Sequence, residues 1–98
     1  MEIIEGSTNN FDELISEGNI LAYFYADWCG SCKMISIELD KIKGSVQIVK
    51  INVDKNKSLC KRFGVMSLPT LIYFNSDNSY KSSIGFKRSN EILDFMKK

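Results

Sequence analysis

Trp28-Cys29-Gly30-Ser31-Cys32-Lys33 is the stretch around which the rest of this sequence is arranged. An apolar run, residues 20–26, precedes it, and a segment with apolar residues at helical spacing follows it. If Cys29 lies at the mouth of that helix and Cys32 one turn further in, their Cβ atoms are about 5–6 Å apart on one face. A disulfide requires about 3.5–4.5 Å, so a slightly tightened first turn could form and release this bond.

The start of a helix is a suitable place for a reactive cysteine. It presents unpaired backbone N–H groups and the positive end of the helix dipole, and both stabilise a thiolate. A thiolate beside a second thiol is the arrangement that performs thiol–disulfide exchange. We therefore predict that Cys29 is the exposed nucleophile, which forms the thiolate more readily, and that Cys32 is the resolving thiol.

Other sites could be built on the same pair. Structural zinc and iron–sulfur sites usually need four ligands, whereas this sequence has no histidine and one further cysteine, Cys60. We therefore expect no metal and no cofactor. A static disulfide is an alternative, although a loop of two residues constrains the unfolded chain little. Cys60 is expected to be a small helix residue facing the core, or otherwise a regulatory or dimer-forming thiol.

Length and composition narrow the classes further. The 98 residues predict a single domain spanning 1–98, and the net charge of +1 gives no electrostatic reason to bind nucleic acid or an anionic membrane. No apolar run approaches the roughly 18 residues of a membrane span, and the first residues lack the pattern of a secretory signal. We therefore expect a cytoplasmic protein, and in that compartment a lone C-x-x-C is more often catalytic than structural.

Apolar periodicity and turn residues divide the chain into alternating strands and helices. Strands are predicted at residues 3–4, 20–25, 46–53, 71–74 and 80–84. The first predicted helix is capped by Ser7 or Thr8, ends at Gly18 and carries on one face Phe11, Leu14 and Ile15. Further helices are predicted after the cysteines up to Gly44, in a short segment with Leu59, Cys60 and Phe63 that is closed by Gly64, and after a cap at Ser89. The order is βαβαβα followed by ββα. It predicts an α/β fold with a mixed central sheet and helices on both faces, and a site at the carboxyl ends of central strands.

Taken together, these features resemble the thioredoxin family over nearly the whole chain, from about residue 3 to residue 95. Trp28-Cys29-Gly30-x-Cys32-Lys33 matches the redox motif of the family. The third strand matches at Lys50, Asn52 and Asp54, Leu68-Pro69-Thr70 matches the cis-proline segment, and Gly85 matches the glycine after the last strand.

The resemblance implies a thioredoxin fold with a cis bond before Pro69, beside the cysteine pair. It also implies that the exposed backbone of Leu68 pairs with an extended substrate segment as an added strand. The apolar substrate surface around it would consist of Trp28, Gly30, Met66, Ser67, Leu68, Ile84, Gly85 and Phe86. The residues that would support the chemistry are Tyr23, Trp28, Gly30, Ser31, Lys33, Lys50 and Pro69.

The activity implied by the resemblance is reduction of protein disulfides by a monomer that a thioredoxin reductase recharges. Its partners would be that reductase and disulfide-containing proteins, with no nucleic acid and no membrane. An oxidase or isomerase of the same fold is one alternative. A binding subunit that uses the fold as a non-catalytic scaffold is another.

Three positions depart from the family pattern. Ser31 stands where most thioredoxins carry proline, and Ile37 replaces a helix-kinking proline, so this helix is expected to run straighter. Tyr23 occupies the place of a buried aspartate that is the supposed proton carrier for the second cysteine. Lys50, which would face that carboxylate, is expected to turn toward water or toward the Tyr23 hydroxyl.

Overall fold

The computed structural model describes residues 2–97. Along the chain these residues form β1 (Ile4–Glu5), α1 (Phe11–Ile15), β2 (Ile20–Tyr25), α2 (Gly30–Ile42), β3 (Gln47–Asn52), α3 (Lys57–Phe63), β4 (Thr70–Phe74), β5 (Tyr80–Ile84) and α4 (Ser89–Lys97). The predicted order, βαβαβα followed by ββα, is confirmed. Among the described residues, no helix is long and apolar enough to cross a membrane.

The strands form one five-stranded sheet in the order β1-β3-β2-β4-β5. The pairs β1–β3 and β3–β2 are parallel, whereas β4 is antiparallel to both β2 and β5. The sheet is therefore mixed, as predicted. In this arrangement β2 is the central strand, with a parallel neighbour on one side and an antiparallel neighbour on the other.

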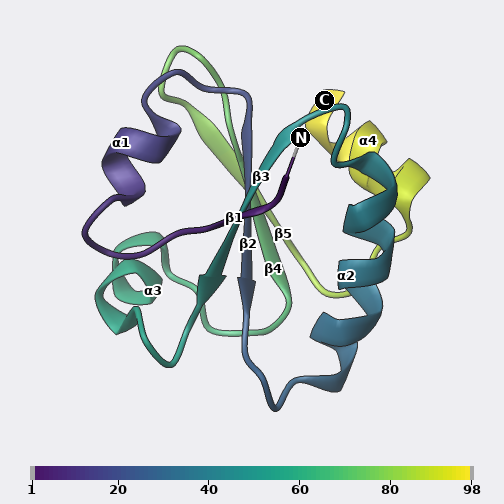
Figure 1. The fold of residues 1–98 in the computed structure, drawn as a ribbon, viewed down its shortest axis with the longest axis horizontal. Helices are drawn as coiled ribbons and strands as arrows, with labels where there is room; N and C mark the ends of the chain where they lie inside the picture. Colours follow the sequence, from purple (N-terminus) through teal and green to yellow (C-terminus); the bar gives the residue numbers. More distant parts are fainter. Residues whose placement is uncertain (1, 98) are drawn as a thin grey trace.

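The helices cover both faces of the sheet, with α2 and α4 on one side and α1 and α3 on the other (Figure 1). Side chains of β2 alternate between two cores, because successive residues of a strand point to opposite faces. Leu21 and Tyr23 pack in the core beneath α2 and α4, whereas Ala22 and Phe24 pack in the core on the opposite face. Tyr23 therefore points toward the helix that carries the cysteines.

The predicted caps of two helices are wrong. Neither Ser7 nor Thr8 caps α1: the residue before this helix is Asn10, and no side chain caps it. The Asn10 side-chain oxygen instead accepts the Ser7 N–H at 2.8 Å, which closes a local turn ahead of the helix. At α4, Ser89 is the first helical residue rather than the cap. Its N–H is bonded to a carboxylate on another helix, Glu38.

The topology brings three segments together at one end of the sheet. Because β4 is antiparallel to β2, Thr70 at the start of β4 pairs with Phe24 near the end of β2. Thr70 also pairs with Ile84, the last residue of β5. The loop that leaves β2, the segment that enters β4 and the segment that leaves β5 therefore meet beside the start of α2 (Figure 1).

Candidate active site

Cys29 is the residue immediately before α2, and Cys32 lies in the first turn of that helix. The two sulfur atoms are bonded to each other, and the Cα atoms are 5.2 Å apart. Cys29 is 7% exposed and Cys32 is 1% exposed. Cys29 is thus the more accessible residue of the pair, although it is buried rather than exposed.

The Cys29 sulfur acts as the side-chain cap of α2. It accepts the backbone N–H of Cys32 at 3.2 Å, a group that has no partner within the helix itself. The Ser31 hydroxyl oxygen lies 3.5 Å from the same sulfur. Both contacts place hydrogen-bond donors at the position where negative charge develops when this sulfur becomes a thiolate.

Trp28 lies on the outer side of the pair and is 70% exposed. Its indole N–H donates to a carboxylate oxygen of Asp54, just beyond β3, at 2.9 Å. In the sequence analysis Asp54 is part of the third-strand match to the family, and no role is predicted for it. The bond to an acceptor from a neighbouring segment fixes the orientation of the indole.

The segment before β4 lies at the same end of the sheet, and the peptide bond between Leu68 and Pro69 is cis, as predicted. The Pro69 carbonyl accepts the N–H of Gly85 at 2.8 Å. This bond ties the start of β4 to the segment that follows β5. Gly85 has φ +95°, a conformation that favours glycine.

Several large apolar side chains at this end are open to solvent, and a group of such side chains, unlike a single one, is typical of an interaction site. Exposed fractions are 93% for Met66, 67% for Ile84 and 38% for Phe86. Gly30 and Ser67 are also exposed, and Leu68 is half-buried. The β5 exit, with Ile84 and Gly85, therefore lies beside the β4 entrance, and exposed apolar side chains are present on both segments.

Tyr23 lies behind the pair, 5% exposed, and its hydroxyl donates to the backbone carbonyl of Cys32 at 2.6 Å. Its ring stacks on Tyr25, with ring centres 5.4 Å apart. Burial raises the pKa of Tyr23 to about 12. The hydroxyl is therefore a neutral hydrogen-bond donor over the whole physiological range of pH.

Comparison with known proteins identifies the family. A family model described as thioredoxin matches residues 2–98. The chain belongs to the thioredoxin family. Among its relatives is a thioredoxin of Bacillus subtilis that is 39% identical over all of this chain and 98% of its own length. A thioredoxin of Rickettsia felis is 35% identical over 87% of this chain and 85% of its own.

Solved thioredoxin structures agree with this membership. A mutant thioredoxin from Halobacterium salinarum NRC-1 matches with a TM-score of 0.89 at 28% identity, over 98% of this chain and 88% of that one. Chloroplastic thioredoxin z matches with a TM-score of 0.83 at 24% identity, over 99% and 93%, and is a likeness of fold alone. With its Cys29–Cys32 pair, this thioredoxin-family chain is a protein-disulfide reductase that works by thiol–disulfide exchange.

Lys50 lies beside Tyr23 in the sheet, at the position that would face the family's buried aspartate. Its ammonium pairs with Glu5 at 3.5 Å and lies 5.6 Å from the centre of the Tyr25 ring. Lys50 makes no hydrogen bond to the Tyr23 hydroxyl, because its ammonium is directed to Glu5, an ion pair that was not predicted from the sequence. The alternative in which Lys50 turns toward water is confirmed, since 42% of its side chain is exposed.

A hollow of about 380 Å³ opens beside the inner cysteine. Its lining includes Cys32 and the exposed Lys33, together with Tyr23, Tyr25, Ala26, Asp27, Ser36 and Lys50. Since one wall is formed by Cys32, water in this hollow can reach the neighbourhood of the second sulfur. No sequence pattern predicts this space, whose lining residues come from α2, β2, β3 and the loop that leaves β2.

Cys60 lies on α3 and packs half-buried against the core beneath α1 and α3, whereas the Cys29–Cys32 pair belongs to the core on the other face of the sheet. Burial raises the pKa of its thiol, so the uncharged form is favoured. The prediction of a core-facing helix residue is confirmed. Among residues 2–97, no three side chains of the kinds that bind metals gather into a site.

Proposed function

We propose that Cys29 is the nucleophile of this reductase and that Cys32 is the resolving thiol. The observation that supports this assignment is the position of the Cys29 sulfur at the helix cap, where the Cys32 N–H and the Ser31 hydroxyl can stabilise its charge. Cys32 is deeper, 1% exposed, and lies where it can attack only a partner already attached to Cys29.

The reaction has two exchanges. The Cys29 thiolate attacks one sulfur of a substrate disulfide, so a Cys29–substrate disulfide forms and the other substrate sulfur leaves as a thiolate, which takes a proton from water. Cys32 then loses its proton and attacks the Cys29 sulfur. The Cys29–Cys32 disulfide forms, the second substrate thiolate leaves, and two electrons have passed from the dithiol to the substrate.

The proton of Cys32 has to leave without a carboxylate at position 23. A tyrosine whose pKa is about 12 cannot act as an anionic base near neutral pH. We assign the proton to water in the 380 Å³ hollow that borders Cys32, or to the departing substrate thiolate. Tyr23 would then hold the first turn of α2 through the Cys32 carbonyl, with Lys33 and Lys50 at the rim of the same hollow.

The substrate would bind at the end of the sheet where the three segments meet. Its backbone would pair with that of Leu68, next to the cis-Pro69, as an added strand. Its side chains would contact the exposed surface of Trp28, Gly30, Met66, Ser67, Ile84, Gly85 and Phe86. Met66 suits such a surface because its flexible side chain adapts to different partners.

We further propose a recycling partner, an oligomeric state and a compartment for this protein, each by extension from the family. The oxidised pair would be recharged by a thioredoxin reductase, and the protein would act as a monomer, in one domain over 1–98, in the cytoplasm. The relatives that match most of the chain are named thioredoxins, which favours reduction over the oxidase, isomerase and scaffold alternatives.

Alkylation of the reduced protein tests which cysteine reacts first. With iodoacetamide below one equivalent at pH 7, we expect Cys29 to carry most of the label, because it is the more exposed residue of the pair and has the helix-cap donors. Peptide mass spectrometry of Cys29, Cys32 and Cys60 gives the distribution. Preferential labelling of Cys32 would reverse the two roles, and preferential labelling of Cys60 would move the reactive thiol out of the pair.

Replacing Ser31 tests the donors around the nucleophile. Ser31→Pro removes the hydroxyl 3.5 Å from the Cys29 sulfur and a backbone N–H, so the thiolate of the reduced form is less stabilised. We expect the reduction potential to fall, by about 30 mV if the loss is about 1.4 kcal/mol. Equilibration of both proteins in the same glutathione buffers measures the difference. An unchanged or higher potential in Ser31→Pro rejects this role for Ser31.

A further inference from the structure

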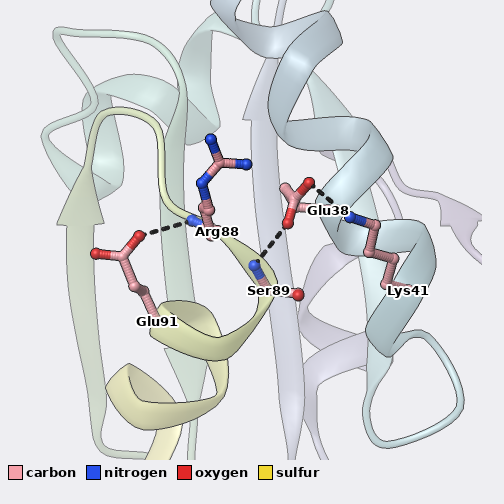
Figure 2. A network of polar contacts seen from close by, with 5 residues as sticks. All are labelled: Glu38, Lys41, Arg88, Ser89 and Glu91. Carbon is pink, nitrogen blue, oxygen red and sulfur yellow. Dashed lines mark hydrogen bonds and ion pairs between the residues drawn. The ribbon is translucent and has the colours of Figure 1, made fainter.

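Glu38 is a charged residue in the middle of α2 that is only 6% exposed. Both of its carboxylate oxygens are bonded (Figure 2). One accepts the backbone N–H of Ser89 at 2.9 Å, and the other accepts the ammonium of Lys41 at 3.0 Å. A carboxylate is costly to bury unless it is bonded in this way, so these contacts account for an acid beneath the surface of the helix pair.

The bond to Ser89 supplies an acceptor that α4 lacks. The first N–H groups of a helix have no partners inside it and are usually met by a side-chain oxygen of the preceding residue. Here that residue is Arg88, whose side chain has no acceptor. The Arg88 N–H is met within α4 by Glu91 at 2.9 Å, and the Ser89 N–H is met from α2 by Glu38 (Figure 2).

The same bond anchors the segment formed by residues 85–88. At its start, the Gly85 N–H is bonded to the Pro69 carbonyl. At its end, Ser89 is bonded to Glu38, on the helix that begins at the cysteine pair. Between the anchors lies Phe86, 38% exposed, with the Arg88 guanidinium carbon 5.8 Å from the centre of its ring. The position of Phe86 relative to the cysteines thus depends on both bonds.

We propose that Glu38 is a positioning residue that holds the 85–88 segment against α2 and thereby sets the preference for protein disulfides over small ones. This inference rests on the proposed contact of the 85–88 segment with substrate. A protein substrate touches Phe86 while its disulfide meets Cys29, whereas a small disulfide needs access to the sulfur alone. The preference therefore separates positioning of this segment from the chemistry of the pair.

The decisive comparison sets Glu38→Leu against Glu91→Ala. Each variant removes one carboxylate from the start of α4, but only Glu38 connects that start to α2. Glu38→Gln keeps an oxygen that can accept the Ser89 N–H. Ser89→Pro deletes the donor itself, at the first helical position, where proline is well tolerated, and it keeps the test decisive if Glu38→Leu does not fold.

The second-order rate constant of each pre-reduced protein is measured with a protein disulfide, insulin, and with a small disulfide, 5,5′-dithiobis(2-nitrobenzoate). Amide hydrogen exchange is followed separately over residues 85–89. For Glu38→Leu and Ser89→Pro, we expect the insulin rate to fall about threefold to tenfold. The small-disulfide rate should stay unchanged, with faster exchange at residues 86–88. Glu38→Gln should keep most of the insulin rate, and Glu91→Ala should keep both rates.

Equal changes in the two rates for Glu38→Leu and Ser89→Pro would overturn the inference. So would matching behaviour of the Glu38→Leu and Glu91→Ala variants, since it would reduce Glu38 to an ordinary helix cap. Failure of the proposed function looks different, because alkylation of the wild-type protein would then label Cys32 or Cys60 ahead of Cys29.

Discussion

Cys32→Ser should capture its substrates as stable mixed disulfides, while Cys29→Ser should lose disulfide reduction altogether. Without Cys32 the first exchange still takes place at Cys29, but no second sulfur lies within reach to release the partner. Without Cys29 the remaining residue of the pair, Cys32, is 1% exposed and lacks the helix-cap position. We expect the reduction rate of Cys29→Ser to fall by about 10³-fold or more, the scale on which loss of a nucleophile acts.

Non-reducing electrophoresis with insulin, followed by peptide mass spectrometry, identifies the sulfur that carries the substrate. The matched control is Cys60→Ser, which removes a thiol from the opposite face of the sheet and should leave both the rate and the products unchanged. Adducts that form at Cys32 in Cys29→Ser, at a rate comparable to those of Cys32→Ser, would contradict the assigned order of the two exchanges.

Tyr23→Asp should destabilise the protein strongly and in a way that depends on pH. Position 23 is 5% exposed, and the nearby ammonium of Lys50 is paired with Glu5. Burial raises the pKa of a carboxyl group above its unfolded value of about 3.9. The native state then holds an extra proton between the two pKa values, so stability falls as pH rises through that window. A shift of about two units corresponds to about 3 kcal/mol at neutral pH.

Tyr23→Asn is the matched control for stability, since it makes the same change in volume but does not titrate. In urea unfolding, the extra loss of stability of Tyr23→Asp relative to Tyr23→Asn should be about 1 kcal/mol at pH 4.5 and about 3 kcal/mol at pH 7.5. An equal change in unfolding free energy with pH for the two variants would contradict this prediction. It would mean that water from the hollow beside Cys32 solvates the side chain at position 23.

Tyr23→Phe is the matched control for chemistry. It removes only the hydroxyl bonded to the Cys32 carbonyl, at a cost of about 1 kcal/mol in stability. Reduction of insulin at pH 7 should persist within a few-fold. A loss of about tenfold or more would show that the hydroxyl moves the proton after all, since general acids and bases act on that scale or above.

Much of the fold could be predicted because local patterns and global topology agree. The apolar run of β2, the glycines that end helices and the hairpin before β5 each specify one element. The order of these elements leaves few ways to arrange a sheet. Strand and helix limits were less predictable, as α1 shows: Asn10, rather than Ser7 or Thr8, precedes the helix, and its side chain is used in the turn before it.

The chemistry of the site could be predicted because a C-x-x-C motif at a helix start places a thiolate beside unpaired N–H groups and a second thiol. Its supporting contacts could not, because they join residues that are distant in sequence. The indole of Trp28 meets Asp54 across 26 positions, and Glu38 meets Ser89 across 51. Neither pair has a local signature. A glutamate in the middle of α2 is, from sequence alone, indistinguishable from the solvated charges beside it.

The central claim is that this protein donates electrons to protein disulfides. The most direct test of this claim is the reduction potential of the Cys29–Cys32 pair. It is measured by equilibrating the protein in glutathione buffers of graded ratio and alkylating the free thiols. We expect a reduction potential of about −270 mV, the value of a thioredoxin, and in any case one below about −230 mV. A value at or above about −180 mV, the range of isomerases and oxidases, would contradict the assignment as a reductase.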